Sequence, residues 1–221
     1  LENHLDYKTS IVPYQLYIQL KTGLRTGEIA GLSWDCVLWE QQAIKTYRRY
    51  DTVRRRWTKA KTEESVRVVP IDKNVIQVLK ELKESQFRML KYYDLENPDN
   101  MISFDLFNGV SSNNTINKWL KNILQELNIQ PLNMTSTGLR HSYCSSLLAM
   151  GIDIWAVSKL MGHKDITEIT ETYGHLVKEK AEEEKNVISE KKNNKAYEKD
   201  LQAIREELIR IHGDSIKNII S

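Results

Sequence analysis

Two arginines, a histidine and a tyrosine stand in short polar motifs that are spread over about 150 residues of this chain: Arg25, Arg140, His163 and Tyr173. A guanidinium group donates paired hydrogen bonds to phosphate and keeps its charge, so two of them could neutralise a phosphodiester during cleavage. A tyrosine hydroxyl is more easily activated than an alcohol and also leaves more readily. Histidine or lysine can supply the proton that the leaving oxygen needs. The set suits cutting and rejoining a phosphodiester without a metal ion or a nucleotide.

The surrounding sequence predicts a mostly helical α+β fold that would hold these motifs. The chain has 221 residues, 40% of them hydrophobic and 28% charged, as in ordinary globular proteins. β-branched residues and polar turns between residues 36 and 70 predict a small three-stranded antiparallel sheet. Apolar residues at helical spacing predict helices over residues 11–32 with a break at Gly23, from Asp72 to about Leu90, and over 113–127, 138–150 and 153–161.

Positive charge is concentrated in one segment of the chain. Residues 43–67 contain nine lysines and arginines against three acidic residues, although the whole chain carries a net charge of +2. This concentration indicates a polyanion bound on one face, and a solvated, charge-rich hairpin is the alternative. With DNA as the polyanion, the candidate binding residues are Arg48, Arg49, Arg54, Arg55 and Lys59.

The motifs together resemble the catalytic domain of tyrosine recombinases of the phage integrase family, from about residue 10 to residue 177. The TGLRTGE run is similar to the family's first arginine box. This resemblance implies that Arg25 clamps the scissile phosphate and that Glu28 supports Arg25.

Four further motifs carry the resemblance through the chain. KAKT followed by RVVP is similar to the β-hairpin with the catalytic lysine, which implies Lys61, with Lys59 as the alternative. GLRH implies that Arg140 is the second phosphate clamp. LMGH implies that His163 hydrogen-bonds the phosphate, and ETYGH implies that Tyr173 is the nucleophile.

One position departs from the family's pattern. The second box usually reads His-x-x-Arg, but Thr137 stands three residues before Arg140. Threonine can hydrogen-bond a phosphate but is no base near neutral pH, so we expect intact phosphate binding with slower chemistry. Thr137→His should then raise cleavage of a suicide substrate. His141 follows Arg140 directly, and we expect it to point to another helix face and to pack there.

Neither histidine nor cysteine spacing indicates a metal site. The intervals of 22 and 12 residues between His141, His163 and His175 match no compact ligand motif. We expect Cys36 and Cys144 to be reduced thiols of a cytoplasmic protein. No metal and no cofactor is therefore expected.

The chain is expected to contain two parts, residues 1–175 as the catalytic domain and 176–221 as a charged tail. An amphipathic helix over about 195–212 is predicted by one apolar stripe: Tyr197, Leu201, Ile204, Leu208 and Ile211. By resemblance, this helix docks on another protomer of a tetramer on DNA. The family's usual N-terminal core-binding domain is not visible in this sequence.

Three functions can be separated by experiment. The leading one is a site-specific recombinase, or integrase, of a phage or other mobile element, which acts on double-stranded DNA through a 3′-phosphotyrosine intermediate. The second is a DNA-binding module without chemistry, in which residues 138–162 form a helix-turn-helix and Arg140 and His163 face a groove, not each other. The third is a type IB topoisomerase. No membrane role is expected, because no apolar run approaches the roughly 20 residues that span a bilayer.

Overall fold

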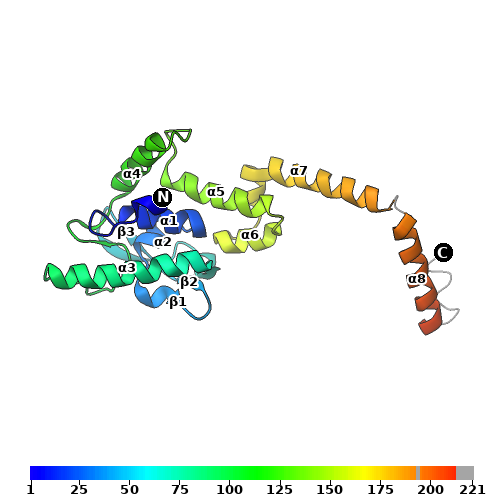
Figure 1. Ribbon diagram of the computed structural model, residues 1–221, viewed down its shortest axis with the longest axis horizontal. Helices are drawn as coiled ribbons and strands as arrows, with labels where there is room; N and C mark the ends of the chain where they lie inside the picture. The colour runs from blue at the N-terminus through cyan, green and yellow to red at the C-terminus, as the bar shows by residue number, and fades with distance from the viewer. Residues whose placement is uncertain (193–194, 213–221) are drawn as a thin grey trace. The chain divides into compact units, whose positions relative to one another are not determined.

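A computed structural model describes residues 1–192 and 195–212 of the chain (Figure 1). The chain divides into two compact units, Leu1–Tyr173 and a C-terminal unit that begins at Gly174. Within the described residues, we find no helix with the length and apolar character needed to cross a lipid bilayer.

The first unit is built mainly from helices. These are α1 (Val12–Thr22), α2 (Thr26–Ala30), α3 (Lys73–Tyr92), α4 (Asn113–Glu126), α5 (Ser136–Ala149), α6 (Ile154–Met161) and the start of α7 (Thr167–Lys192). The strands are β1 (Val37–Leu38), β2 (Ala43–Thr46), β3 (Arg48–Asp51), β4 (Arg56–Lys59), β5 (Arg67–Pro70), β6 (Phe104–Asp105) and β7 (Gly109–Val110). The expected α+β class is confirmed, with most of the chain helical.

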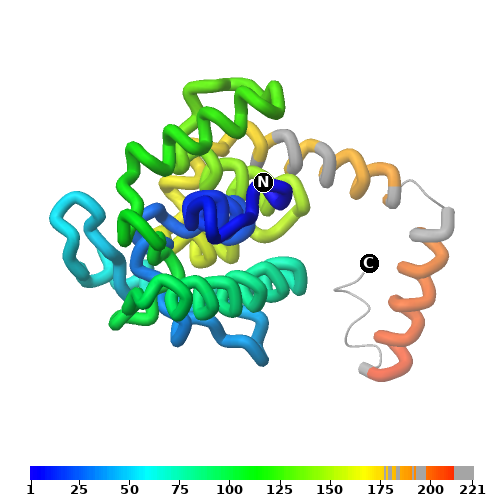
Figure 2. Tube along the Cα trace, turned by 60° about the vertical axis from the view of Figure 1, so that its left-hand side comes forward, coloured from blue at the N-terminus to red at the C-terminus, as the bar shows by residue number. Residues whose placement is uncertain are grey.

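The predicted three-stranded antiparallel sheet is present in the order β1-β2-β5. Ile44 of β2 lies opposite Val69 of β5, and both side chains are fully buried. Strands β3 and β4 form a separate antiparallel hairpin between β2 and β5 in the chain. The hairpin is the cyan segment that extends away from the helices in Figure 2. The hairpin is therefore separate from the sheet that supports the core, although β3 packs on α2.

Helix α1 lies at the centre of the first unit and is buried on two faces. One face joins a core with the sheet and with Val75, Leu79 and Leu82, which form the apolar stripe of α3. The opposite face packs on α4 and α5 through Val12 and Leu16. Each of these buried side chains contributes about 1.5–3 kcal/mol to folding. This packing fixes the C-terminal end of α1, where the first arginine motif begins.

Capping residues set where the neighbouring helices start. Asp72 accepts a hydrogen bond from the Val75 amide at 2.9 Å and begins α3. Asp153 accepts from the amides of Trp155 and Ala156 and begins α6. Each cap supplies a partner for backbone N–H groups that a helix start leaves unpaired.

The second unit contains the rest of α7 and helix α8 (Lys195–His212). α8 covers the range where the sequence predicts an amphipathic helix. Ile204 and Ile211 are 56% and 61% exposed, while Leu201 and Leu208 are half-buried. The side chain of Tyr197 lies outside the described residues.

Candidate active site

The first arginine is held at the junction of α1 and α2. Gly23 ends α1 in the left-handed conformation, with φ of 63°, and a Cβ there would lie 2.4 Å from the Tyr143 ring. Arg25 then caps α2, and its amide donates to Glu28 Oε2 at 2.8 Å. Its guanidinium donates to Glu28 Oε1 at 3.1 Å and to the Gly162 carbonyl at 3.2 Å. The side chain of Arg25 is thus fixed toward the end of α6.

A second arginine, Arg67 of β5, braces the same carboxylate and was not predicted as a site residue from the sequence. Its two Nη atoms donate to Glu28 at 3.1 and 3.2 Å, and its Nε donates to the Leu160 carbonyl at 2.7 Å. Glu28 is only 4% exposed. Burial alone would raise the pKa of Glu28, but Arg67 and Arg25 outweigh burial and lower it. An arginine within the apolar RVVP strand was the available signal, because such a residue needs a buried partner.

Gly162 makes the approach of Arg67 possible. It ends α6 in the left-handed conformation, with φ of 68°. A Cβ at this position would lie 2.7 Å from Arg67 Nη1 and 3.0 Å from the Glu64 carbonyl. The glycine therefore supplies both the turn after α6 and the space through which Arg67 reaches the end of that helix.

Arg140 of α5 reaches the same turn from the other side. It is 7% exposed and donates to the carbonyls of Gly23 and Met161. Arg25 and Arg140, which are far apart in sequence, thus bond the successive carbonyls of Gly162 and Met161. Burial and the nearby charge of Arg25 lower the pKa of Arg140 to about 10, so it stays cationic at neutral pH.

His163 completes this cluster. Its Nε2 lies 2.9 Å from Arg140 Nη2 and 3.2 Å from Glu168 Oε1. Burial, assisted by Arg140 and opposed by Glu168, lowers the pKa of His163 to about 4, so its ring is neutral at pH 7. In a neutral ring, Nε2 either accepts from Arg140 or donates to Glu168. Arg140 and His163 contact each other, which is opposite to the arrangement that a helix-turn-helix module requires.

The two candidate lysines lie differently with respect to this cluster. Lys61 follows β4, is exposed, and lines a pocket of about 60 Å³ together with Arg25 and Glu28. Lys59 ends β4, lies opposite Arg48 of β3, and is not among the residues that line this pocket. The geometry favours Lys61 as the lysine of the site.

The remaining basic candidates lie on the β3–β4 hairpin. The Arg48 guanidinium lies 3.7 Å from the centre of the Trp57 ring, a cation–π contact that fixes it against the hairpin. Arg49 donates to the Lys59 carbonyl across the two strands at 3.2 Å. Arg54 and Arg55 are exposed at the turn, where Arg54 pairs with Asp51 at 3.2 Å. Arg48 and Arg49 line the same pocket as Arg25 and Lys61, whereas Arg54 and Arg55 do not.

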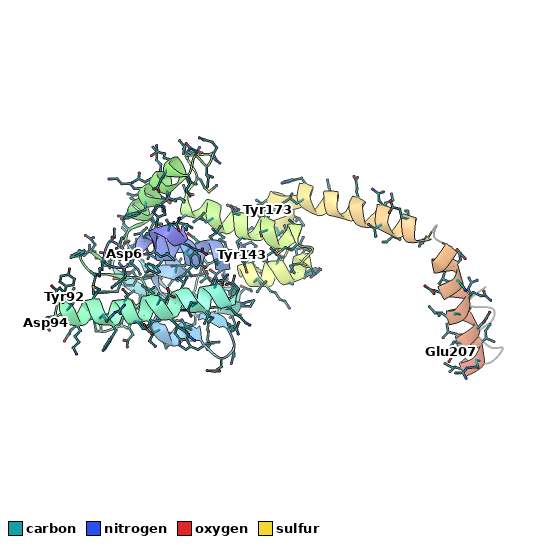
Figure 3. The ribbon with its side chains drawn as sticks, in the orientation of Figure 1. Asp6, Tyr92, Asp94, Tyr143, Tyr173 and Glu207 are labelled. Carbon is teal, nitrogen blue, oxygen red and sulfur yellow. The ribbon has the colours of Figure 1, made fainter. Side chains whose placement is uncertain are left out.

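Tyr173 lies on the first turns of α7 (Figure 3) and is 7% exposed. Its hydroxyl shares a hydrogen bond with His141 Nδ1. His141 lies on another face of α5 than Arg140, as expected, but the expectation that it packs there is wrong, because it is exposed and its ring contacts the candidate nucleophile. Thr137 is exposed in the first turn of α5. The missed signal was the four-residue spacing from Thr137 to His141, which places both on one helix face.

The fold is that of tyrosine recombinase catalytic domains, as two of the matching solved structures illustrate. The Tn1549 transposon integrase in complex with transposon right end DNA matches with a TM-score of 0.60 and 22% identity, over 72% of this chain and 53% of that one. The XerH site-specific recombinase bound to palindromic difH substrate matches with a TM-score of 0.57 and 16% identity, over 80% and 46%.

The chain belongs to the phage integrase family, whose model matches residues 3–180. It is 27% identical to a XerC-like tyrosine recombinase of Caldanaerobacter subterraneus subsp. tengcongensis, over 71% of this chain and 43% of that protein. It is 26% identical to the ICEBs1 integrase of Bacillus subtilis, over 73% of this chain and 44% of that protein. It is 28% identical to the integrase of Staphylococcus phage L54a, over 79% of this chain and 51% of that protein. The chain therefore spans about half the length of these relatives.

Proposed function

We propose that this chain cuts and rejoins double-stranded DNA as the catalytic part of a site-specific recombinase of a mobile element. Tyr173 would attack the scissile phosphate and form a 3′-phosphotyrosine with release of a 5′ hydroxyl. A 5′ hydroxyl from the partner duplex would reverse the step. The observation that carries the proposal is the convergence of Arg25 and Arg140 on the adjacent carbonyls of Met161 and Gly162.

The balance of charge in the cluster supports an anionic ligand. Arg25, Arg67 and Arg140 surround one buried carboxylate, that of Glu28, and Glu168 is 66% exposed. A single carboxylate, which Arg25 and Arg67 share, cannot balance the three guanidinium groups. A phosphate bound there would relieve their repulsion and accept their remaining N–H donors. The guanidinium groups would supply the charge neutralisation that this chemistry needs, so the proposal calls for no metal ion and no cofactor.

The lysine and the hairpin have separate roles in the proposal. Lys61, which shares a pocket with Arg25, would protonate the leaving 5′ oxygen. Arg54 and Arg55 at the hairpin turn would contact DNA phosphates away from the cleavage point. We place this work on DNA in the cytoplasm.

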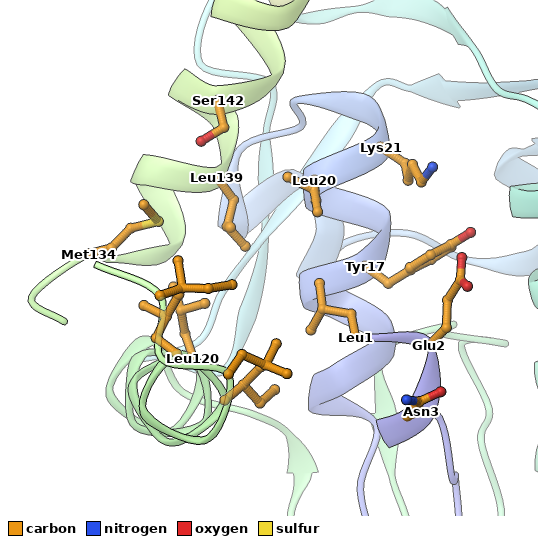
Figure 4. Close-up of a pocket in the computed structure, with 14 residues that line it drawn as sticks. Leu1, Glu2, Asn3, Tyr17, Leu20, Lys21, Leu120, Met134, Leu139 and Ser142 are labelled. Carbon is orange, nitrogen blue, oxygen red and sulfur yellow. The ribbon is translucent and has the colours of Figure 1, made fainter. Parts of the chain in front are cut away.

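Assembly on DNA is proposed to use helix α8 of a neighbouring copy. Four of its apolar residues form one stripe, Leu201, Ile204, Leu208 and Ile211, of which Ile204 is 56% exposed. An apolar pocket of about 500 Å³ between α1, α4 and α5 offers a complementary surface on the first unit (Figure 4). Deleting residues 195–221, or changing Leu127 at the pocket edge to Glu, should weaken pairing of two DNA sites and spare binding to one. Equal loss of both activities would contradict this assignment.

Covalent trapping tests the proposed activity. The chain is incubated with a pool of nicked duplexes that carry random sequence around the nick, and the products are separated on a denaturing gel. We expect a DNA–protein adduct that disappears in Tyr173→Phe and falls at least about 100-fold in Arg140→Ala. DNA binding without any adduct, equal in the wild type and Tyr173→Phe, would instead support a binding module.

A further inference from the structure

The Tyr173 hydroxyl has a specific partner in this structure, the Nδ1 atom of His141. The two rings lie 5.8 Å apart at an angle of 51°. Tyr173 is 7% exposed, whereas His141 is exposed. The histidine therefore links a buried hydroxyl to solvent on the outer side of α5.

The environment of Tyr173 makes a base in contact with it necessary. Burial, reinforced by the neighbouring Cys144, raises the pKa of Tyr173 above its ordinary value. The positive charge of Arg140 acts in the opposite direction but does not outweigh burial. The phenol therefore stays protonated at neutral pH and must lose its proton to another group as it attacks.

Other titratable groups around the hydroxyl are poorly suited to take this proton. Cys144 is fully buried, and burial raises the pKa of its thiol. Nε2 of His163 is engaged by either Arg140 or Glu168, depending on which ring nitrogen carries the proton. Arg140 is already protonated at neutral pH. Among the described residues, His141 is the base that hydrogen-bonds the hydroxyl.

Helix geometry explains how His141 reaches this position. Thr137, His141 and Cys144 follow one another at spacings of four and three residues, so they share one face of α5. Thr137 occupies the turn before His141 and has a hydroxyl that is no base near neutral pH. The imidazole thus stands one turn further along the same helix face.

We propose that His141 is the general base of the strand-cleavage step. As Tyr173 Oη bonds to phosphorus, its proton passes to His141 Nδ1, and the bond from phosphorus to the 5′ oxygen breaks. A separate acid protonates the leaving oxygen. In the rejoining step, His141 returns the proton to Tyr173 as the phosphotyrosine bond breaks. This inference rests on the proposed DNA cleavage.

The test measures the rate of adduct formation between about pH 5 and 8, the range in which imidazole groups change charge. The pool of nicked duplexes described above is the substrate, and His141→Gln is the main variant. We expect a rate about 100-fold lower than the wild type at neutral pH, at the lower end of what a positioned base supplies. The wild-type rate should fall toward acid pH, because a protonated base cannot accept the Tyr173 proton, and this fall should be absent from the variant.

Two further comparisons separate a base from a structural role. A substrate with sulfur in place of the leaving 5′ oxygen needs no acid, so it should rescue Lys61→Ala but leave His141→Gln slow. Thr137→His should restore part of the activity that His141→Gln loses, because it places an imidazole one turn away on the same face of α5. Thermal melting of each variant serves as the folding control.

The outcomes distinguish the inference from the proposed function. If the wild type forms no adduct that depends on Tyr173, the proposal that this chain cleaves DNA is wrong. If the wild type reacts and His141→Gln reacts equally fast, or faster, with the same pH profile, the contact is a resting interaction and His141 is not the base. Rescue of His141→Gln by the sulfur substrate would also overturn the assignment.

Discussion

Replacing Glu28 with glutamine should strongly destabilise the first unit, because it leaves Arg67 charged and buried without a counterion. The Arg67 side chain is 7% exposed and makes two hydrogen bonds to the Glu28 carboxylate. Breaking such a buried pair from one side costs about 3–5 kcal/mol. Typical domains are stable by about 5–15 kcal/mol, so the variant should lose a large part of its stability.

The variant isolates the charge because glutamine can still accept the helix-capping hydrogen bond. Glu28 accepts from the Arg25 amide at the start of α2, and Gln can fill that role. Glu28→Ala should therefore lose about 1 kcal/mol more than Glu28→Gln. Arg67→Met in the Glu28→Gln background should recover part of the loss, because it removes the unpaired charge. The Leu160 carbonyl then lacks its partner, which leaves a cost of about 1–3 kcal/mol.

The effect should also depend on pH in a defined direction. The pKa of Glu28 in the folded protein is lowered from its ordinary value of 4.5. The contribution of the Glu28 carboxylate to the free energy of unfolding is therefore complete above about pH 4.5. It is lost as the pH falls through the pKa of Glu28 in the folded protein, which is lower. The difference in the free energy of unfolding between the wild type and Glu28→Gln should therefore become smaller in acid.

Urea unfolding followed by tryptophan fluorescence measures these changes. All five tryptophans lie before residue 174, so the signal reports on the first unit. The reasoning about the buried pair would be refuted if Glu28→Gln lowered the free energy of unfolding by less than about 1 kcal/mol at neutral pH. It would also be refuted if the difference from the wild type stayed the same in acid.

Three further predictions concern the lysines, the hairpin and His163. Lys61→Ala should lower adduct formation about 100-fold while Lys59→Ala changes it little, and the reverse order would assign the acid to Lys59. Arg54→Gln and Arg55→Gln should each reduce the slope of log Kd against log salt concentration by about 1, measured by fluorescence anisotropy; an unchanged slope would remove them from the DNA contact. Because the folded pKa of His163 is about 4 and its ordinary value is 6.5, the stability linked to its neutral form should fall as pH decreases from 6.5 toward 4. His163→Gln should flatten this part of the stability curve, and an equally steep curve in the variant would contradict the assignment.

The sequence predicts the scaffold well where local signals are strong. The apolar spacing of α3 and the cap at Asp72 are enough to identify that helix from the sequence alone. Gly23 and Gly162 mark the ends of α1 and α6, and both adopt the left-handed conformation. These signals depend on residues close together in the chain, which explains why they can be read from it.

Contacts between distant segments could not be predicted in the same way. The bracing of Glu28 by Arg67 joins α2 to β5 across 39 residues, and nothing local to either residue identifies the other. The contact between His141 and Tyr173 depends on how α7 packs on α5. The sequence places His141 on a different face from Arg140, but it does not show that Tyr173 of α7 lies beside His141.

Mass spectrometry of the trapped adduct tests the central claim most directly. After nuclease and protease digestion, we expect one modified peptide, with a nucleotide joined through its 3′ phosphate to Tyr173. The released DNA strand should carry a free 5′ hydroxyl. Attachment at any other residue, or a nucleotide joined through its 5′ phosphate, would contradict the proposed strand cleavage by Tyr173.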